Sequence, residues 1–331
     1  MKLRAAIVGL GQAGSRFDEE PRGAVWSHAG AFLALSDDYE LIAGADPDAE
    51  NRRRFAARCP DASVFPDAES IRDLDVDVVS IATPPSVRLA IFKVILGGVR
   101  KPKVIVCEKP LSTDAATRKV LVEMCEAANV SLLVNYNRRY SKLYQQFSAA
   151  LRNGAIGQVA SITVRTPNRL WSVGSHALDL LLYLSGELPL EIATLPLPAL
   201  AERGELAGDF ICNFPSGSAG RMLTQGPSRV LIFEADAIGS TGRLTARNNG
   251  RQLELVPFVA SKEYLGYLEC GQPRLLYQTT PDESAFVEVI KEAANLAKNV
   301  GSGTCTGQTA MVSEELLDKV VRRVGGSTSD K

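Results

Sequence analysis

Residues 3–14, LRAAIVGLGQAG, constrain the fold of this 331-residue chain more than any other stretch. The stretch opens with a short, almost continuously apolar run, which is typical of a parallel strand buried on both faces. Gly9, Gly11 and Gly14 follow at G-x-G-x-x-G spacing. The first glycine permits a tight turn, the second lets the backbone approach a pyrophosphate, and the third lets a helix pack close to the strand. The motif predicts a dinucleotide site that includes Gln12 and Ala13, although an ordinary glycine-rich turn has the same spacing.

An acidic residue at the end of the next expected strand supports the dinucleotide site. Residues 39–45, YELIAGA, are typical of a strand, and Asp46 follows it. A carboxylate at this point accepts hydrogen bonds from the adenosine ribose, but the interval from Gly14 exceeds the usual one of about 20 residues. The run 18–23, DEEPRG, breaks the first helix, and Ser27 can cap a resumed one. We therefore expect an inserted loop over residues 17–27, either beside the cofactor cleft or as plain surface.

Length and composition indicate two globular domains with ordinary cores, because the chain is 45% hydrophobic and 23% charged. The 37 basic and 38 acidic residues give a net charge of -1, which offers no basic excess for nucleic acid or an anionic membrane. No apolar run approaches the length of a membrane span, and the N-terminus runs straight into the first strand. The six cysteines form no C-x-x-C pair, so we expect free thiols, a cytoplasmic protein and no metal site.

Two different patterns divide the chain. Up to about residue 135, short apolar runs alternate with helical segments, which predicts a doubly wound parallel sheet. From residue 158 onward, strand candidates follow one another with few helices between them, which predicts an α+β domain with a mostly antiparallel open sheet. These candidates are residues 159–166, 209–214, 220–224, 229–233, 243–246 and 252–256. Helices are expected at 174–184, 284–298 and 309–324.

We therefore expect a Rossmann dinucleotide-binding domain at 1–136 and a second domain at 137–331 for substrate binding and oligomerisation. The last helix, at about 309–324, is a candidate to pack back on the first domain. The sheet of the second domain has helices for one face only, which points to a homodimer or homotetramer.

Few residues in the sequence suit proton chemistry. His176 and Asp179 share a face of one expected helix, and histidine exchanges protons near neutral pH. Lys109 follows an expected parallel strand, at the edge where ligands of such sheets bind. A buried histidine with a structural hydrogen bond and a surface lysine are the alternatives that spacing alone leaves open.

The order of several motifs resembles that of the glucose–fructose oxidoreductase, inositol dehydrogenase and rhizopine-catabolism family, Gfo/Idh/MocA. The matching pieces are GLGQAG at 9–14, GADPD at 44–48, IATPP at 81–85, CEKPLS at 107–112, NYNRRY at 135–140, AIGQV at 155–159 and GSHALDLLLYL at 174–184. Members carry out NAD(P)-dependent oxidation or reduction, mostly of sugars and cyclitols. The resemblance implies that Lys109 and His176 are catalytic and that Asp179 and Tyr136 frame the nicotinamide and substrate. It adds Ala82, Thr83, Pro84, Glu108 and Lys109 to the cofactor site, and Arg138 and Trp171 to the substrate site.

Two departures from the family pattern bear on the substrate. Ser172 stands where many members have an aspartate, four residues before the histidine, so the usual Lys-Asp-His set is incomplete. Arg88 stands where many members have a histidine, and with Arg138 it could favour an anionic substrate, because guanidinium suits carboxylate and phosphate. The alternative is that such arginines pair with nearby acids.

The combined interpretation is an oxidoreductase that transfers a hydride between a nicotinamide and a carbinol or keto carbon of a sugar, cyclitol or sugar derivative. NAD is the expected cofactor because Asp46 would repel a 2′-phosphate, with NADP as the alternative. Two other functions stay open. One is a reductase of nucleotide-linked keto-sugars in a biosynthetic pathway, and the other is an NAD(P)-binding regulator without catalysis.

Overall fold

A computed structural model describes residues 2–20, 23–167, 169–196, 206–226 and 230–326. The chain forms two compact units, Met1–Tyr140 with Pro281–Val312, and Ser141–Thr280 with Ser313–Lys331. This division differs from the single boundary predicted between residues 136 and 137. Residues 281–312 return to the first unit, and the third crossing, between residues 312 and 313, lies inside the last helix.

The first unit contains a six-stranded parallel sheet with the order β3-β2-β1-β4-β5-β6, which confirms the predicted doubly wound fold. The strands are β1 (Leu3–Val8), β2 (Tyr39–Ala45), β3 (Ser63–Phe65), β4 (Val78–Ile81), β5 (Val104–Cys107) and β6 (Ser131–Val134). The strand order reverses between β1 and β4, and ligands of such sheets bind at that reversal, beyond the carboxyl ends of the strands. The central strands are buried on both faces, as their continuous apolar runs predict.

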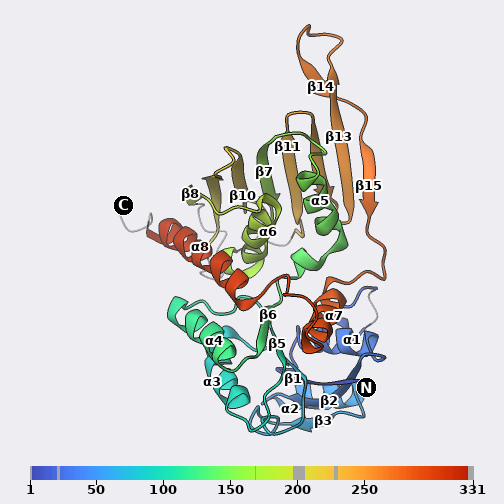
Figure 1. Cartoon of the computed structure of the whole chain (residues 1–331), viewed down its shortest axis with the longest axis vertical. Coiled ribbons are helices and arrows are strands. Elements are labelled where there is room, and N and C mark those ends of the chain that lie inside the picture. The colour runs from blue at the N-terminus through green and yellow to red at the C-terminus, as the bar shows by residue number, and fades with distance from the viewer. Residues whose placement is uncertain (1, 21–22, 168, 197–205, 227–229, 327–331) are drawn as a thin grey trace. The chain divides into compact units, whose positions relative to one another are not determined.

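Helices of the first unit are α1 (His28–Ala34), α2 (Ala49–Arg58), α3 (Pro85–Leu96), α4 (Ala115–Ala127) and α7 (Ala285–Ala297). Asp48 caps α2 by accepting hydrogen bonds from Glu50 N and Asn51 N. Asp114 caps α4 by accepting a hydrogen bond from Thr117 N, and Pro84 precedes α3. Figure 1 shows α7 beside α1, and Tyr39 in β2 donates a 2.9 Å hydrogen bond to a carbonyl in α7. This helix therefore completes the core of the first unit.

The second unit contains a nine-stranded mixed sheet in which only the β7–β10 pair is parallel. Its order is β14-β13-β12-β11-β7-β10-β9-β8, and β15 also pairs with β13. The strands are β7 (Val159–Arg165), β8 (Glu191–Pro196), β9 (Gly208–Asn213), β10 (Ala219–Leu223), β11 (Glu234–Gly239), β12 (Gly242–Arg247), β13 (Gln252–Ala260), β14 (Leu268–Cys270) and β15 (Arg274–Gln278). The mostly antiparallel open sheet is thus confirmed, but the strand expected at 229–233 is wrong. Residues 227–229 lie outside the described residues, and the strand begins only at Glu234.

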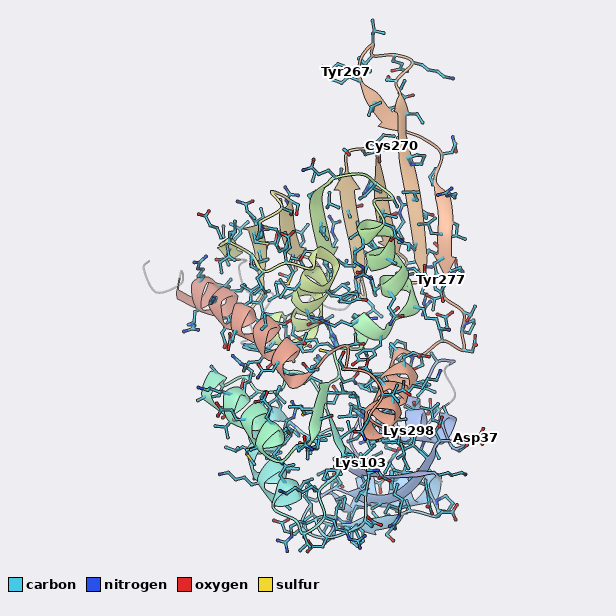
Figure 2. All side chains as sticks on the ribbon, viewed as in Figure 1. Asp37, Lys103, Tyr267, Cys270, Tyr277 and Lys298 are labelled. Carbon is cyan, nitrogen blue, oxygen red and sulfur yellow. The ribbon has the colours of Figure 1, made fainter. Side chains whose placement is uncertain are left out.

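Helices α5 (Lys142–Arg152) and α6 (Ser175–Ser185) pack on one face of this sheet, as Figure 1 shows. The last helix, α8 (Gly307–Gly326), adds Leu317 and Val320 to the core of the second unit. Strands β13 and β14 form a hairpin whose end is exposed, and Figure 2 labels Tyr267 and Cys270 there. In the described part of the chain, no helix is long and apolar enough to cross a membrane.

Candidate dinucleotide site and catalytic residues

The glycine turn after β1 has the geometry that its spacing predicts. Gly9 has a φ of +92°, and a Cβ there would lie 2.8 Å from Thr83 Cγ2. A Cβ on Gly14 would lie 1.9 Å from the carbonyl oxygen of Gly9, so no larger residue fits. Gly11 has no atom within 4 Å of an added Cβ. The first and third glycines therefore permit the close packing of the turn, and the second faces open space.

The main chain of this turn suits an anionic group. Within the described residues, the N–H groups of Gly11, Gln12 and Ala13 donate no hydrogen bond, whereas Ser15 N and Arg16 N donate to the carbonyl oxygen of Gly11. Unpartnered N–H groups that follow a strand and open a helical turn form a cradle for phosphate. The residues present thus fit the pyrophosphate of a dinucleotide.

Asp46, at the end of β2, holds the glycine turn from the other side. Its Oδ2 accepts a 2.7 Å hydrogen bond from Leu10 N, and its Oδ1 accepts one of 2.8 Å from Asp48 N. Arg52 Nη1 donates to the carbonyl oxygens of Asp46 and Pro47, at 2.8 and 2.9 Å. The carboxylate is buried. Oδ2 also accepts from Asn51 Nδ2 at 3.3 Å, so Oδ1 is the oxygen that keeps a lone pair for a ribose hydroxyl. The expected acid is therefore in place beside the turn.

The inserted loop predicted at residues 17–27 interrupts the first helix. The helical turn that follows the glycines ends near Phe17, and the helix resumes after Ser27. The side chain of Ser27 caps α1 by accepting a 3.0 Å hydrogen bond from Gly30 N. His28 N and Ala29 N then donate to the carbonyl oxygens of residues 13 and 14, at 3.0 and 2.9 Å. Hydrogen bonds thus join the two parts of the helix across the insertion, which confirms the resumed helix.

Asp18 fixes the insertion at its base. Its carboxylate accepts hydrogen bonds from Trp26 N, Ser27 N and Ser27 Oγ, and Arg58 Nη1 lies 2.7 Å from its Oδ1. Burial opposes ionisation, but the hydrogen bonds from Ser27, Trp26 and Arg58, together with the charge of Arg58, hold the pKa of Asp18 below its usual value. The start of α1 is therefore held by a charged cluster.

The loops that follow β4 and β5 form the next part of the edge. Ala82 N donates to Val8 O and Glu108 N donates to Ile81 O, which continues the parallel pairing beyond the strands. Thr83 Oγ1 is buried and has no hydrogen-bond partner among the described residues, while Pro84 beside it is exposed. An unpartnered hydroxyl at this edge fits a polar group of a bound cofactor.

Arg88 has a different environment from the one the sequence suggested. It is only 2% exposed, and its guanidinium donates to the carbonyl oxygens of Thr83, Pro110 and Leu111. Because these carbonyls belong to both loops, Arg88 ties the two loops together. These hydrogen bonds give Arg88 a positioning role inside the unit, and its part in substrate binding stays a prediction.

Glu108 and Lys109 follow β5, and Glu108 has partners that sequence reasoning missed. His28 Nε2 lies 3.1 Å from Glu108 Oε1, and Asn135 Nδ2 donates to the same oxygen at 2.5 Å. Burial raises the pKa of Glu108, but these contacts and the charge of Lys109 bring it below its usual value. No role was predicted for His28 from the sequence. Ser27 as the cap of the resumed helix was the available signal, because it places His28 at the helix start.

Tyr136 and Arg138 follow β6 in the first unit. Tyr136 is fully buried next to Asn135, whose N–H donates to Cys107 O at 2.8 Å. Arg138 lies in a short 3-10 helix, η2 (Asn137–Tyr140), and is half-buried. The structure thus places both residues past the carboxyl end of β6, at the same edge as the glycine turn.

His176, Asp179, Trp171 and Ser172 belong to the second unit. Trp171 and Ser172 lie in a π-helical turn, η3 (Leu170–Gly174), which leads into α6. The carbonyl of Ser172 accepts a 2.8 Å hydrogen bond from Ser175 Oγ. His176 is 9% exposed, while Asp179 is fully buried and accepts a 2.8 Å hydrogen bond from Ser313 in α8. The predicted shared face of α6 is present, and one carboxylate oxygen of Asp179 contacts α8.

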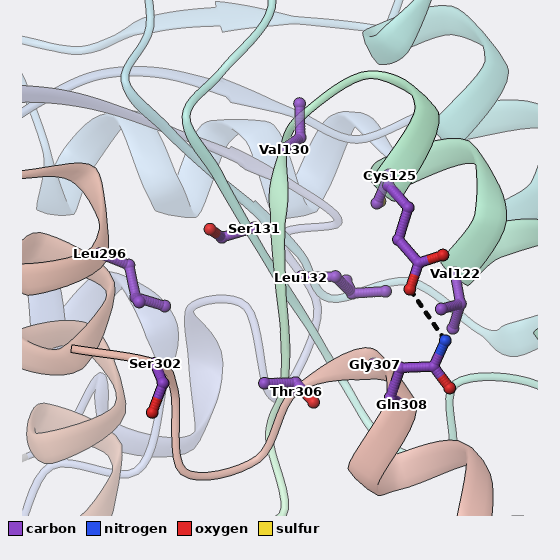
Figure 3. A pocket seen from close by; sticks show the side chains of 11 residues that line it. Val122, Cys125, Val130, Ser131, Leu132, Leu296, Ser302, Thr306, Gly307 and Gln308 are labelled. Atoms are coloured by element: carbon purple, nitrogen blue, oxygen red, sulfur yellow. Dashed lines mark hydrogen bonds between the residues drawn. The ribbon is translucent and has the colours of Figure 1, made fainter. Parts of the chain in front are cut away.

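A separate pocket of the first unit lies beside β6 (Figure 3). Apolar side chains of Val122, Leu132 and Leu296 line it, and Gln308 donates a 2.8 Å hydrogen bond to Glu126 at its rim. None of the predicted site residues lines this pocket. Among the described residues, no three potential metal ligands of the His, Cys, Asp and Glu types come together.

Comparison with known proteins agrees with this geometry. Residues 3–136 match the family described as the oxidoreductase family with an NAD-binding Rossmann fold, GFO_IDH_MocA. Myo-inositol 2-dehydrogenase of Thermotoga maritima is 25% identical over 270 residues, which cover 74% of this chain and 75% of that protein. Inositol 2-dehydrogenase of Rhodococcus jostii is 31% identical over 163 residues, or 47% of this chain and 40% of that protein.

Solved structures extend the likeness to the whole fold. The crystal structure of the WlbA dehydrogenase from Bordetella pertussis in complex with NADH and UDP-GlcNAcA has a TM-score of 0.77. The superposition covers 99% of this chain and 98% of the WlbA chain, and the two sequences are 19% identical. Residues 3–136 thus match the oxidoreductase family GFO_IDH_MocA, with its NAD-binding Rossmann fold, and the solved structure shares the fold of the whole chain.

Proposed function

We propose that the chain oxidises a carbinol carbon of a sugar, cyclitol or sugar derivative with NAD, or reduces the corresponding ketone. The observation that carries the proposal is the free N–H cradle at residues 11–13 beside Asp46, at the strand reversal of the parallel sheet. NAD, when bound, supplies the hydride acceptor, and the chain aligns the cofactor and handles the proton. The similarity of the chain to the two inositol dehydrogenases above supports a polyol as its substrate.

Within this proposal, residues of the first unit hold the cofactor. Gly11, Gln12 and Ala13 hold the pyrophosphate, and Asp46 accepts from the adenosine ribose. Ala82, Thr83, Pro84 and Glu108 shape the nicotinamide half of the site.

Lys109 and His176 are the proposed catalytic residues. In oxidation the substrate hydroxyl loses a proton, and a neutral His176 accepts it. Lys109 hydrogen-bonds the same oxygen and stabilises negative charge on it. The reverse assignment, with Lys109 as the base, requires a lysine pKa well below the usual value of about 10.4. Tyr136, Asp179, Trp171, Ser172 and Arg138 are proposed to frame the substrate, and Arg138 would favour an anionic one.

A panel of substrates tests the activity. Calorimetry first establishes NAD binding, and the appearance of NADH absorbance is then followed with myo-inositol, aldoses, sugar acids and UDP-linked sugars. The UDP-sugars belong in the panel because the WlbA structure holds UDP-GlcNAcA. We expect turnover with at least one member and loss of turnover in Lys109→Ala. NAD binding without turnover on any member would support the regulator instead.

We also propose a cytoplasmic homodimer or homotetramer that associates through the sheet face of the second unit opposite α5 and α6. Apolar residues on that face are exposed among charged pairs, including Ile211 at 48% and Ile238 at 39%. An exposed apolar surface favours contact with a partner subunit. Five of the six cysteines are buried free thiols, which suits a reducing compartment. Light scattering at micromolar concentration tests the assembly, and a monomer would refute it.

A further inference from the structure

An arginine, Arg16, lies at the adenosine end of the proposed cofactor site. It begins the short 3-10 helix η1 (Arg16–Asp18), which follows the glycine turn. Its N–H donates to the carbonyl oxygens of Gly11 and Gln12, at 3.1 and 3.0 Å. The backbone of Arg16 therefore belongs to the same turn as the phosphate cradle.

The side chain of Arg16 is connected to the carboxylate of Asp46 through one intermediate residue. Arg16 Nη1 donates to Asn51 Oδ1 at 3.3 Å, and Asn51 Nδ2 donates to Asp46 Oδ2 at 3.3 Å. Asn51 lies in the first turn of α2, so these hydrogen bonds run from the glycine turn across α2 to the end of β2. Asp46 is the residue expected at the adenosine ribose. The guanidinium of Arg16 thus lies two hydrogen bonds from the group that would meet the ribose 2′-hydroxyl.

Arg16 differs from neighbouring arginines because no carboxylate of the described chain pairs with it. Arg54 Nε lies 2.8 Å from Glu50 Oε1, and Arg58 also has an acidic partner, Asp18, at 2.7 Å. Arg16 is half-buried, and its Nη2 donates no hydrogen bond to a described residue. Its Nε is enclosed by the protein, so the guanidinium can meet a ligand only through its terminal nitrogens. A guanidinium in this state suits an anion that arrives with the ligand.

Arg52 is a second cation near Asp46, and its contacts fit a structural role. Its Nη1 donates to the carbonyl oxygens of Asp46 and Pro47, at 2.8 and 2.9 Å. These bonds direct Arg52 to the main chain between β2 and α2. Arg16 instead reaches a side chain that itself contacts the carboxylate, so it is the better placed of the two cations for a group on the ribose.

We propose that Arg16 is a specificity-determining residue of the adenosine site, whose terminal nitrogens bind the 2′-phosphate of NADP. The site then takes NADP as a second cofactor beside NAD. This role rests on the proposed function, because it concerns the dinucleotide of the same site. Asp46 and Arg16 act in opposite directions on a 2′-phosphate. The carboxylate repels it, whereas the guanidinium matches it in charge and in hydrogen-bond geometry.

Calorimetry on the full chain, without substrate, tests this role. The dissociation constants of NAD and NADP are measured for the wild type and for Arg16→Gln, which removes the charge but keeps a hydrogen-bonding side chain. We expect the affinity for NADP to fall about 10-fold or more, the scale of a hydrogen bond to a charged group. The affinity for NAD should change little, because NAD has no 2′-phosphate. Arg16→Lys keeps the charge without the planar fork, so it should lose less NADP affinity than Arg16→Gln.

Two matched variants separate a local contact from the general charge of this surface. Arg53→Gln removes the same charge from an exposed position of α2, where the side chain is 70% exposed, and should leave both affinities unchanged. Arg52→Gln should not reproduce the selective loss of NADP. If Arg16→Gln does not fold, the wild type is treated with an arginine-modifying dicarbonyl reagent and read by peptide mass spectrometry. NADP should then protect Arg16 more than NAD does.

An equal loss of NAD and NADP affinity in Arg16→Gln would overturn the proposal, because Arg16 would then bind a group that both dinucleotides share. An unchanged NADP affinity in this variant, equal protection of Arg16 by the two dinucleotides, or no measurable NADP binding by the wild type would overturn it as well. Each of these results is compatible with NAD binding, so the proposed oxidoreductase activity would stand. Conversely, a chain that loses NADP selectively in Arg16→Gln but turns over no polyol or sugar would contradict the proposed activity and leave the role of Arg16 in place.

Discussion

Arg88 donates from Nε and Nη2 to the carbonyl oxygen of Thr83, at 3.0 and 2.7 Å. Its remaining terminal nitrogen, Nη1, reaches the carbonyl oxygens of Pro110 and Leu111. One buried guanidinium therefore joins the loop after β4 to the loop that carries Lys109. A planar group with several donors in a fixed geometry suits this task, because the three acceptors lie on two separate loops.

Arg88→Lys should destabilise the first unit and loosen both loops, because an ammonium cannot serve all of these carbonyls. We expect the free energy of unfolding to fall by about 1–3 kcal/mol, the usual cost of leaving buried polar groups unpaired. Denaturant unfolding measures this change. Arg100→Lys is the matched control, since Arg100 is exposed and pairs with Asp75 at the surface. An unchanged stability with a higher KM for an anionic substrate would support a part of Arg88 in substrate binding.

The sequence predicted the first unit well, because its strands are buried on both faces and read as apolar runs between helices. The glycine spacing and Asp46 predicted the geometry of the turn after β1, since both features act through the local backbone. The insertion was visible for the same reason, as proline and acidic residues interrupt a helix whose cap follows.

The second unit was less predictable, because its strands are short and half-exposed. Residues 230–233, VLIF, looked like a strand, but in the structure Leu231 is 71% exposed and the strand starts at Glu234. The true strand, EADAIG, alternates small and charged residues, so its apolar signal is weak. Strands β8, β14 and β15 and helix α5 were missed. Contacts between distant segments were also invisible in the sequence, as with His28 and Glu108, which lie 80 positions apart.

Asp46 should set the preference for NAD over NADP. Its carboxylate would repel a 2′-phosphate, and it also holds Leu10 N in the glycine turn. We expect Asp46→Ala to weaken NAD binding about 10-fold or more, as for loss of hydrogen bonds to a charged group, and to reduce the NAD/NADP preference. Calorimetry with both oxidised cofactors measures the two affinities.

Asp48→Ala is the control for this measurement, because Asp48 caps α2. It should cost about 1 kcal/mol of stability without changing the cofactor preference. Tighter binding of NADP than of NAD by the wild-type chain would contradict the role of Asp46 in cofactor preference. Arg52, which donates to the carbonyl of Asp46, would then become a second candidate ligand of the 2′-phosphate.

Lys109→Ala and His176→Ala should each lower kcat by about 10²-fold or more, the usual scale for positioned acid–base groups. NAD affinity should change little, because neither side chain belongs to the glycine turn. Ser172→Ala should lower kcat far less than either, because Ser172 already lacks the carboxylate that many family members have at this position. Steady-state kinetics on the substrate found in the panel test these values. Near wild-type turnover of His176→Ala would make this histidine structural.

Asp18 should make the stability of the first unit depend on acid pH. Its pKa is lowered in the folded state, so its ionised form adds stability above the unfolded value of about 3.9. That contribution is lost as the pH falls through the lower, folded pKa. We expect the free energy of unfolding of the wild type to fall more between pH 7 and pH 3 than that of Asp18→Asn. At pH 7 the variant should already be less stable, because Arg58 loses its ion-pair partner at 2.7 Å.

Denaturant unfolding at several pH values measures both effects. Asp37→Asn is the control for a carboxylate at an exposed position, which Figure 2 labels, and its stability profile should follow the wild type. Because Asp18 fixes the start of α1, Asp18→Asn should also displace His28. A variant with the same acid slope as the wild type would show that the carboxylate is not the group that titrates, and the cap formed by Ser27 alone would then have to hold the resumed helix.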